Sequence, residues 1–208
     1  MDMKDLSVAS LSAQAASVSP TPGGESVSAL AGAYSAALLC MVARFTVDRQ
    51  GYEDVWDEMR VIIEKAESAR EWLLENIQKD SEAYAAVLAA MSLPKDTDEQ
   101  KLTRTDAIQQ AFRYAADVPY AVAERAYELM ELIELAVSKG NKNTVSDGLV
   151  AALLCRGAVL GAILNVRINL DSIKDEAYVA DLREKCALLE QMVTDREAAI
   201  IKLAPELA

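Results

Sequence analysis

The sequence predicts an all-α protein, a multi-helix bundle with two central apolar helices. Hydrophobic residues make up 52% of the 208 residues but aromatic residues only 5%, so alanine and aliphatic side chains must form the core. The chain has only 8 glycines and 5 prolines, which favours long helices joined by short connections. Apolar residues recur with a period of 3.6, and no stretch of useful length alternates as a strand does. The length suits one domain, residues 1–208.

The first half of the chain contains three predicted helices. A weak helical stripe covers residues 6–16 and precedes a turn that carries two prolines and two glycines. A helix rich in small apolar residues follows from about Ser26 to Arg44, with Glu25 beside the positive end of its dipole. Residues 52–91 keep the helical period for so long that we expect a kink near Asp80 and Ser81.

The second half is predicted to be helical as well. Pro94 breaks the preceding helix, Thr97 or Asp98 caps the next one, and Pro119 interrupts it. The pattern continues over residues 121–137 and stops at a glycine. The second buried helix begins at Ser146 or Asp147, and Asp175 caps a last amphipathic helix.

Charge and cysteine content point to a cytoplasmic protein that does not bind nucleic acid. The net charge is −12 with no basic cluster, so nucleic acid is not expected as a partner. The apolar stretches 27–43 and 148–166 fall short of a strongly apolar span of about 20 residues, so no membrane segment or secretory signal is predicted. Cys40, Cys155 and Cys186 are expected to be buried free thiols in a reducing compartment.

The chain contains no histidine, which limits the chemistry available to it. This removes Ser-His-Asp and Cys-His catalysis and every histidine-based zinc site. Acid–base work must fall to carboxylates, lysines, tyrosines or water.

Polar groups gather where the two apolar helices begin. Gly23 and Gly24 permit close backbone approach to a ligand at the first helix, whose N-terminus offers free N–H groups. The start of the second apolar helix carries Asn141, Asn143 and Asp147. The alternative interpretation is that these residues only form turns and cap helices.

Three further polar residues lie within apolar surroundings. Asn165 and Asn169 are four residues apart, hence on one helix face, where they either tie helices together or line a polar cleft. Asp80 lies one turn before Tyr84 in an alanine-rich segment, and it is either a solvated helix residue or part of a site.

Several sequence motifs resemble those of one protein family, and they follow one another in the same order as in that family along nearly the whole chain. They are SPTPGG and the apolar helix after it (19–42), DSEAYAAVLAAMSLPKDTDEQK (80–101), AIQQAFRYAADVP (107–119), GNKNTVSD (140–147) and LNVRINL (164–170). These motifs are similar to those of the C-terminal family of formiminotransferase-cyclodeaminase, which includes bacterial methenyltetrahydrofolate cyclohydrolases. The resemblance implies an all-helical homodimer.

The resemblance also implies an activity without metal or organic cofactor. It is hydrolysis of 5,10-methenyltetrahydrofolate to 10-formyltetrahydrofolate, or cyclisation of 5-formiminotetrahydrofolate with loss of ammonia, and the length of the chain favours the first. Asp80 or Asp147 would be the base. The residues expected to bind substrate are Pro22, Gly23, Gly24, Glu25, Ser26, Arg44, Tyr84, Asn141, Asn143, Asn165 and Asn169.

The chain departs from the family pattern at three positions. Glu25 stands where relatives usually have the third glycine of Pro-Gly-Gly-Gly-Ser, Arg44 replaces an asparagine, and Asp48 replaces a glycine before a run of lysines. Arg44 and Arg49 could replace the lost cations, or Arg44 could pair with Glu25. Two alternatives therefore stay open: a diverged member that acts on a non-folate metabolite, and a catalytically silent ligand-binding dimer. The retained polar motifs at buried helix starts argue against the silent dimer.

Overall fold

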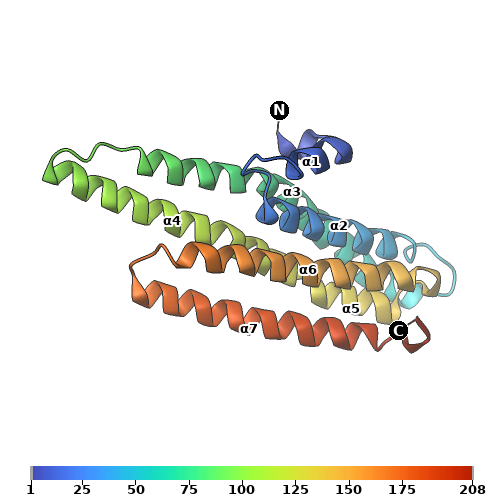
Figure 1. The fold of residues 1–208 in the computed structure, drawn as a ribbon. Coiled ribbons are helices and arrows are strands. Elements are labelled where there is room, and N and C mark those ends of the chain that lie inside the picture. Colours follow the sequence, from blue (N-terminus) through green and yellow to red (C-terminus); the bar gives the residue numbers. More distant parts are fainter. Residues whose placement is uncertain (1, 208) are drawn as a thin grey trace.

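The computed structural model describes residues 2–207, and in this range the protein is an elongated bundle of helices without a strand (Figure 1). The prediction of an all-α bundle is confirmed. The α-helices are α1 (Val8–Ala15), α2 (Gly24–Arg44), α3 (Trp56–Met91), α4 (Asp98–Tyr127), α5 (Leu129–Lys139), α6 (Val145–Leu170) and α7 (Glu176–Ile201).

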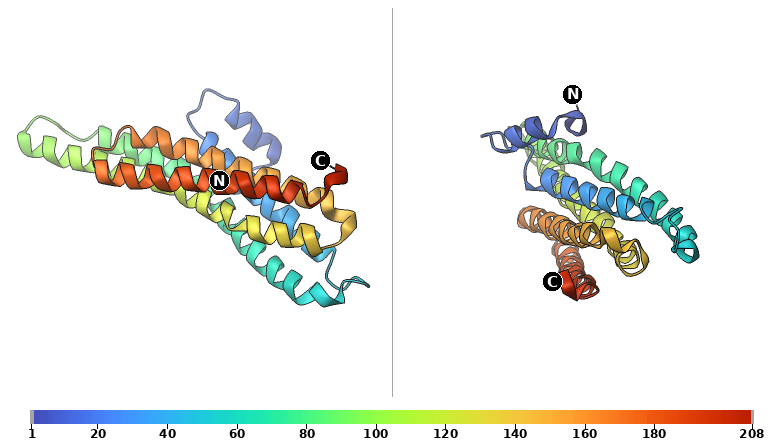
Figure 2. Two further views of the ribbon diagram at one scale, coloured as in Figure 1. Left: turned by 90° about the horizontal axis from the view of Figure 1, so that it is seen from below. Right: turned by 90° about the vertical axis from the view of Figure 1, so that its right-hand side faces the viewer.

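The apolar helices α2 and α6 pack against each other in antiparallel directions. The Ser35 hydroxyl near the middle of α2 donates a hydrogen bond of 2.8 Å to the Ala151 carbonyl of α6. Gly148 near the start of α6 approaches Val42 near the end of α2, and Gly161 approaches Ser28 near its start. The views in Figures 1 and 2 show α3 and α4 behind this pair and α7 beside α6.

Both central helices are long and apolar enough to cross a membrane when judged by length and composition alone. Within the bundle, 61% of the most apolar window of α2 and 50% of that of α6 are buried, as is common for core helices. Both buried faces are rich in alanine, and α2 adds buried serines and a glycine, so the backbones can approach closely.

The hairpin of α3 and α4 extends beyond the other helices (Figure 1) and contains a small core of its own. This core consists of Ala83, Val87, Ala90, Ala111, Ala115 and Val118. α3 is one uninterrupted helix through Asp80 and Ser81, where we predicted a kink.

The predicted interruption at Pro119 is wrong, because α4 continues through this residue to Tyr127. Proline has no backbone N–H, so the carbonyl of Ala115, four residues earlier, loses its usual helical donor. The side-chain amide of Asn169 on α6 donates to this carbonyl at 2.9 Å. A neighbouring helix therefore supplies the hydrogen bond that Pro119 removes.

Several local predictions are confirmed. Thr97 and Gln100 form a reciprocal capping box at the start of α4, and Asp175 caps α7 by accepting from the Tyr178 N–H. α2 begins at Gly24 and α6 at Val145, each slightly earlier than predicted. The three cysteines are buried and free.

Candidate functional site

The start of α2 presents an open helix N-terminus. Gly23 occupies the N-cap position and has no side chain to accept a hydrogen bond from the first turn. Gly24, the first residue of the helix, is exposed, whereas Glu25 and Ser26 after it are buried. Of the N–H groups that a helix start leaves without an intrahelical partner, that of Gly24 therefore belongs to an exposed residue. The Ser19 hydroxyl donates to the Thr21 carbonyl at 2.7 Å, which stabilises the turn that leads into the helix.

A carboxylate from α3 is held against this turn. The Ser26 hydroxyl lies 2.8 Å from Asp80 Oδ2 and 3.0 Å from the Ile77 carbonyl, so it links α2 to two positions on α3. A Cβ atom placed on Gly23 would lie 3.8 Å from Asp80 Oδ2. Asp80 itself is half-buried and can therefore meet both the protein and a ligand.

Glu25 is the second carboxyl group of the site. Glu25 is only 5% exposed, and its Oε1 atom is buried without a hydrogen-bond partner among the described residues. Burial, and after it the negative charge of Asp80, raise the pKa of Glu25 from 4.5 to about 8. Glu25 is therefore mostly protonated and neutral at pH 7.

The amides of α6 complete this end of the bundle. The Asn165 side chain faces Gly24, and a Cβ atom on Gly24 would lie 3.5 Å from its Nδ2. Asn165 Nδ2 donates to the Gly161 carbonyl at 2.8 Å. Asn169 uses its Nδ2 for the carbonyls of Ala115 and Asn165, so it ties α6 to α4. Of the two interpretations of Asn169, the tie between helices is the one that these contacts support.

The other residues predicted near Asp80 also lie at this end. Pro22 is buried, and Tyr84 follows Asp80 by one turn of α3 and is 42% exposed. The structure thus brings together Pro22, Gly23, Gly24, Glu25, Ser26, Asp80, Tyr84, Asn165 and Asn169, which we call the α2-start cluster.

The remaining predicted residues lie at the opposite end of the central helices. α2 has 21 residues; at a rise of about 1.5 Å per residue its two ends are about 30 Å apart. Arg44 ends α2, and Asn141, Asn143 and Asp147 surround the start of α6. We call Asn141, Asn143 and Asp147 the α6-start cluster.

Contacts within the α6-start cluster are mainly structural. Asn141 donates from Nδ2 to the Phe45 carbonyl at 3.0 Å and accepts from the Asn143 N–H at 3.0 Å. Its own N–H donates to the buried Thr46 hydroxyl. Asn141 therefore fastens the loop before α6 to the end of α2, whereas Asn143 is exposed and Asp147 half-buried.

The suggested pair between Arg44 and Glu25 is wrong within this chain. Arg44 Nη2 lies 2.6 Å from Glu67 Oε1 on α3, and the length of α2 separates it from Glu25. Glu67 also binds Arg70, so this end of the molecule has its own network of charges.

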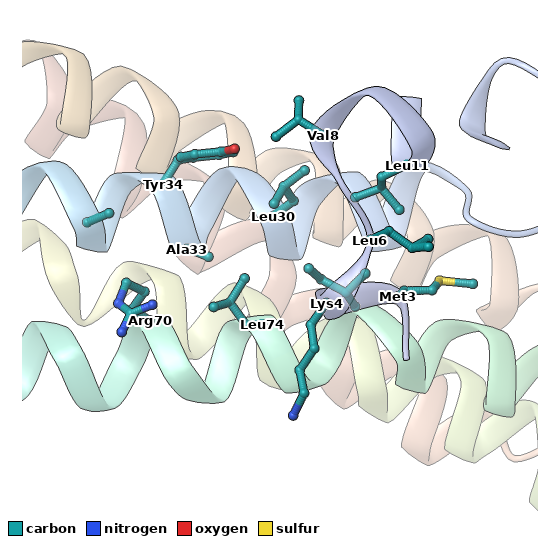
Figure 3. Close-up of a pocket in the computed structure, with 12 residues that line it drawn as sticks. Met3, Lys4, Leu6, Val8, Leu11, Leu30, Ala33, Tyr34, Arg70 and Leu74 are labelled. Atoms are coloured by element: carbon teal, nitrogen blue, oxygen red, sulfur yellow. The ribbon is translucent and has the colours of Figure 1, made fainter. Parts of the chain in front are cut away.

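A cavity of about 200 Å³ lies beside the α2-start cluster, beneath the N-terminal segment (Figure 3). Its walls are mainly the apolar side chains of Leu6, Leu11, Leu30, Leu74 and Ile77. Sequence reasoning missed both this cavity and the role of the Ile77 and Ala115 carbonyls, because a backbone acceptor leaves no signal in the residue type. Within residues 2–207 no group of three Cys, Asp or Glu side chains is placed to hold a metal ion.

An all-helical bundle with a carboxylate fixed at an open helix start defines the structural class, and comparison with known proteins identifies the family. Residues 7–188 match the sequence model of the formiminotransferase-cyclodeaminase family, and the chain belongs to this family. It is 39% identical over 177 residues to a methenyltetrahydrofolate cyclohydrolase of Methylorubrum extorquens, covering 85% of each chain.

Two further relatives extend this comparison. A formimidoyltransferase-cyclodeaminase of Sus scrofa is 36% identical over 88% of this chain, which spans only 34% of that relative. The crystal structure of a formiminotetrahydrofolate cyclodeaminase from Thermotoga maritima superimposes with a TM-score of 0.88 at 34% identity, over 98% of both chains.

Proposed function

We propose that this protein is a folate cyclohydrolase or cyclodeaminase that hydrolyses 5,10-methenyltetrahydrofolate or cyclises 5-formiminotetrahydrofolate. The observation that carries the proposal is the Ser26–Asp80 contact, which fixes a carboxylate beside the open start of α2. The relatives named above are enzymes of these two reactions. Their shared family makes a folate derivative the substrate class that best fits this site.

The chemistry of hydrolysis matches the groups of the α2-start cluster. The carbon that water attacks lies in a cationic amidinium group. A neighbouring carboxylate stabilises the positive charge of this group. Asp80 is the base for this water because Ser26 orients it and it remains partly solvated. The free N–H groups of α2 and the Asn165 amide are placed to hold polar atoms of the pterin.

The absorbance decay of 5,10-methenyltetrahydrofolate tests this function. We expect rapid decay with the wild-type protein, little change after dialysis against a chelator, and a loss of about 10²- to 10⁴-fold in Asp80→Asn. Glu82→Gln, two residues away and exposed, is the matched control and should keep its activity. Decay no faster than the enzyme-free blank would refute folate hydrolysis, and ammonia release from the formimino substrate would then test the cyclodeaminase.

We further propose that the protein is a homodimer in which a second copy covers the faces of α2 and α6. These faces expose a row of apolar side chains: Val27, Tyr34, Val150, Leu153, Leu164 and Ile168. Leu164 and Ile168 are 64% and 71% exposed. Two such helices, each about 10 Å across and 30–40 Å long, offer roughly 700 Å², close to the 800 Å² per partner of a standard stable interface.

A two-fold axis that lies in the interface and runs perpendicular to α2 and α6 would bring the two polar clusters together from different copies. Because α2 and α6 are antiparallel, each subunit carries the α2-start cluster at one end of this face and the α6-start cluster at the other. Rotation about such an axis sets the α2-start cluster of one copy opposite the α6-start cluster of the second. Asp80 and Asp147 would then serve one substrate from two chains.

Mixing two variants tests this arrangement. If Asp80→Asn and Asp147→Asn are each inactive, an equal mixture that exchanges subunits should recover about a quarter of wild-type activity, because half the dimers are mixed and each has one intact site. No recovery, or full activity of Asp147→Asn alone, would contradict the shared site. Leu164→Asp should release monomers in sedimentation analysis, whereas the exposed control Leu102→Asp on α4 should not.

A further inference from the structure

Glu25 is a carboxyl group with no structural partner that accounts for its burial. It lies in the first turn of α2 beside Ser26, and only 5% of the residue is exposed. Its Oε1 is fully buried and has no hydrogen-bond partner within the part of the chain that the structure describes. Buried polar groups in folded proteins are normally satisfied, so this oxygen points to a partner that the isolated chain does not supply.

The surroundings of Glu25 keep it neutral. α3 contributes Asp80, whose negative charge opposes ionisation of Glu25, and α6 contributes the uncharged amide of Asn165 at this end. Burial is the larger cause and Asp80 the smaller, and both raise the pKa of Glu25, to about 8. Two adjacent carboxyl groups therefore differ in state: one is buried and protonated, and the other is held by a hydroxyl at the surface of the site.

We propose that Glu25 is the proton donor of the reaction and acts on the nitrogen that leaves the attacked carbon. This inference rests on the folate function proposed above. A pair of carboxyl groups in unlike environments is a common means of supplying an acid and a base at one site. Asp80 takes the role of base, and Glu25 takes that of acid.

The steps balance for hydrolysis of the methenyl bridge. Water bonds to the bridging carbon and gives one proton to Asp80, which leaves a neutral hydroxyl adduct. The bond from this carbon to N5 then breaks, its electron pair moves to N5, and N5 takes the proton of Glu25. The hydroxyl group loses its proton as the carbonyl forms, and the proton on Asp80 restores Glu25. One water is consumed and one proton is released.

The pH profile of kcat for wild type, Glu25→Gln and Glu25→Asp tests this role. For wild type we expect kcat to fall as pH rises through about 8, approaching tenfold per pH unit, because ionised Glu25 has no proton to donate. Glu25→Gln should lower kcat by about 10²- to 10⁴-fold, leave KM nearly unchanged and abolish this alkaline decline. Glu25→Asp should restore part of the rate together with the decline.

The outcomes separate the two proposals. Glu25→Gln with wild-type kcat and an unchanged pH profile would overturn the role of Glu25 while leaving the folate function intact. A wild-type protein with no activity on either folate would overturn the folate function and, with it, this role. Unfolding curves of each variant show that it is folded, so a slow but stable Glu25→Gln supports proton donation rather than a structural defect.

Discussion

Replacing Glu25 by glutamine should make the protein more stable at neutral and alkaline pH. The folded pKa is about 8 and the reference value is 4.5. Between these values the folded chain keeps a proton on Glu25 that the unfolded chain has released, so wild-type stability falls as pH rises. A pKa that moves from 4.5 to about 8, at about 1.4 kcal/mol for each tenfold change in proton affinity, corresponds to roughly 5 kcal/mol over this window. Glutamine has nearly the same shape and does not titrate.

Urea unfolding followed by circular dichroism at pH 5, 6, 7 and 8 measures this difference. The free energy of unfolding of Glu25→Gln relative to wild type should increase steadily from pH 5 to pH 8, by several kcal/mol. Glu184→Gln, at an exposed position of α7, is the control and should show no such trend. Asp80→Asn should reduce the dependence, because the charge of Asp80 is the second cause of the raised pKa. A difference that stays constant with pH would refute the burial of a neutral Glu25.

Three further predictions concern the fold and are tested by chemical unfolding. Asn169→Ala should cost about 1–3 kcal/mol, and this cost should fall by about 1 kcal/mol in a Pro119→Ala background, where α4 regains its own donor; additive costs would contradict the link. Gly148→Ala should cost about 1–3 kcal/mol, because its Cβ would lie 2.6 Å from Val137 Cγ2; an unchanged midpoint would show that Val137 moves freely. Thr97→Ala should cost about 1 kcal/mol by removing the capping box, and equal stability would mean that the start of α4 frays in the wild type.

Much of the fold could be predicted because its signals are local. The capping residues Thr97 and Asp175 act within three residues of their own position, and the apolar period marks each long helix directly. Pro119 shows where this reasoning stops. Whether a proline ends a helix depends on what meets the freed carbonyl, and here the donor is Asn169, which lies 54 residues after Ala115. A rule based on neighbouring residues could not include that contact.

In the candidate site, too, some features could be predicted from the sequence and others could not. The sequence marked both helix starts as polar, and the structure places Ser26 and Asp80 in contact as members of one cluster. The burial of Glu25 could not be predicted, because a charged residue in a first helical turn usually lies in water, where it stabilises the helix dipole. Only the packing of α3 and α6 around this turn makes Glu25 a neutral group.

The separation of the two helix starts follows from the antiparallel packing of α2 and α6. Two antiparallel helices of similar length necessarily begin at opposite ends. Asp80 contacts Ser26, and Gly148, next to Asp147, approaches Val42, so at a rise of about 1.5 Å per residue of α2 a single chain holds the two carboxylates about 25 Å apart. A small substrate cannot contact both within one chain. If both clusters act on one substrate, the second must come from another copy, and the exposed apolar side chains between the two ends, Leu153 and Leu164 among them, are where that copy would bind. The subunit-mixing experiment therefore tests the geometry of the site and the reason for the exposed face together.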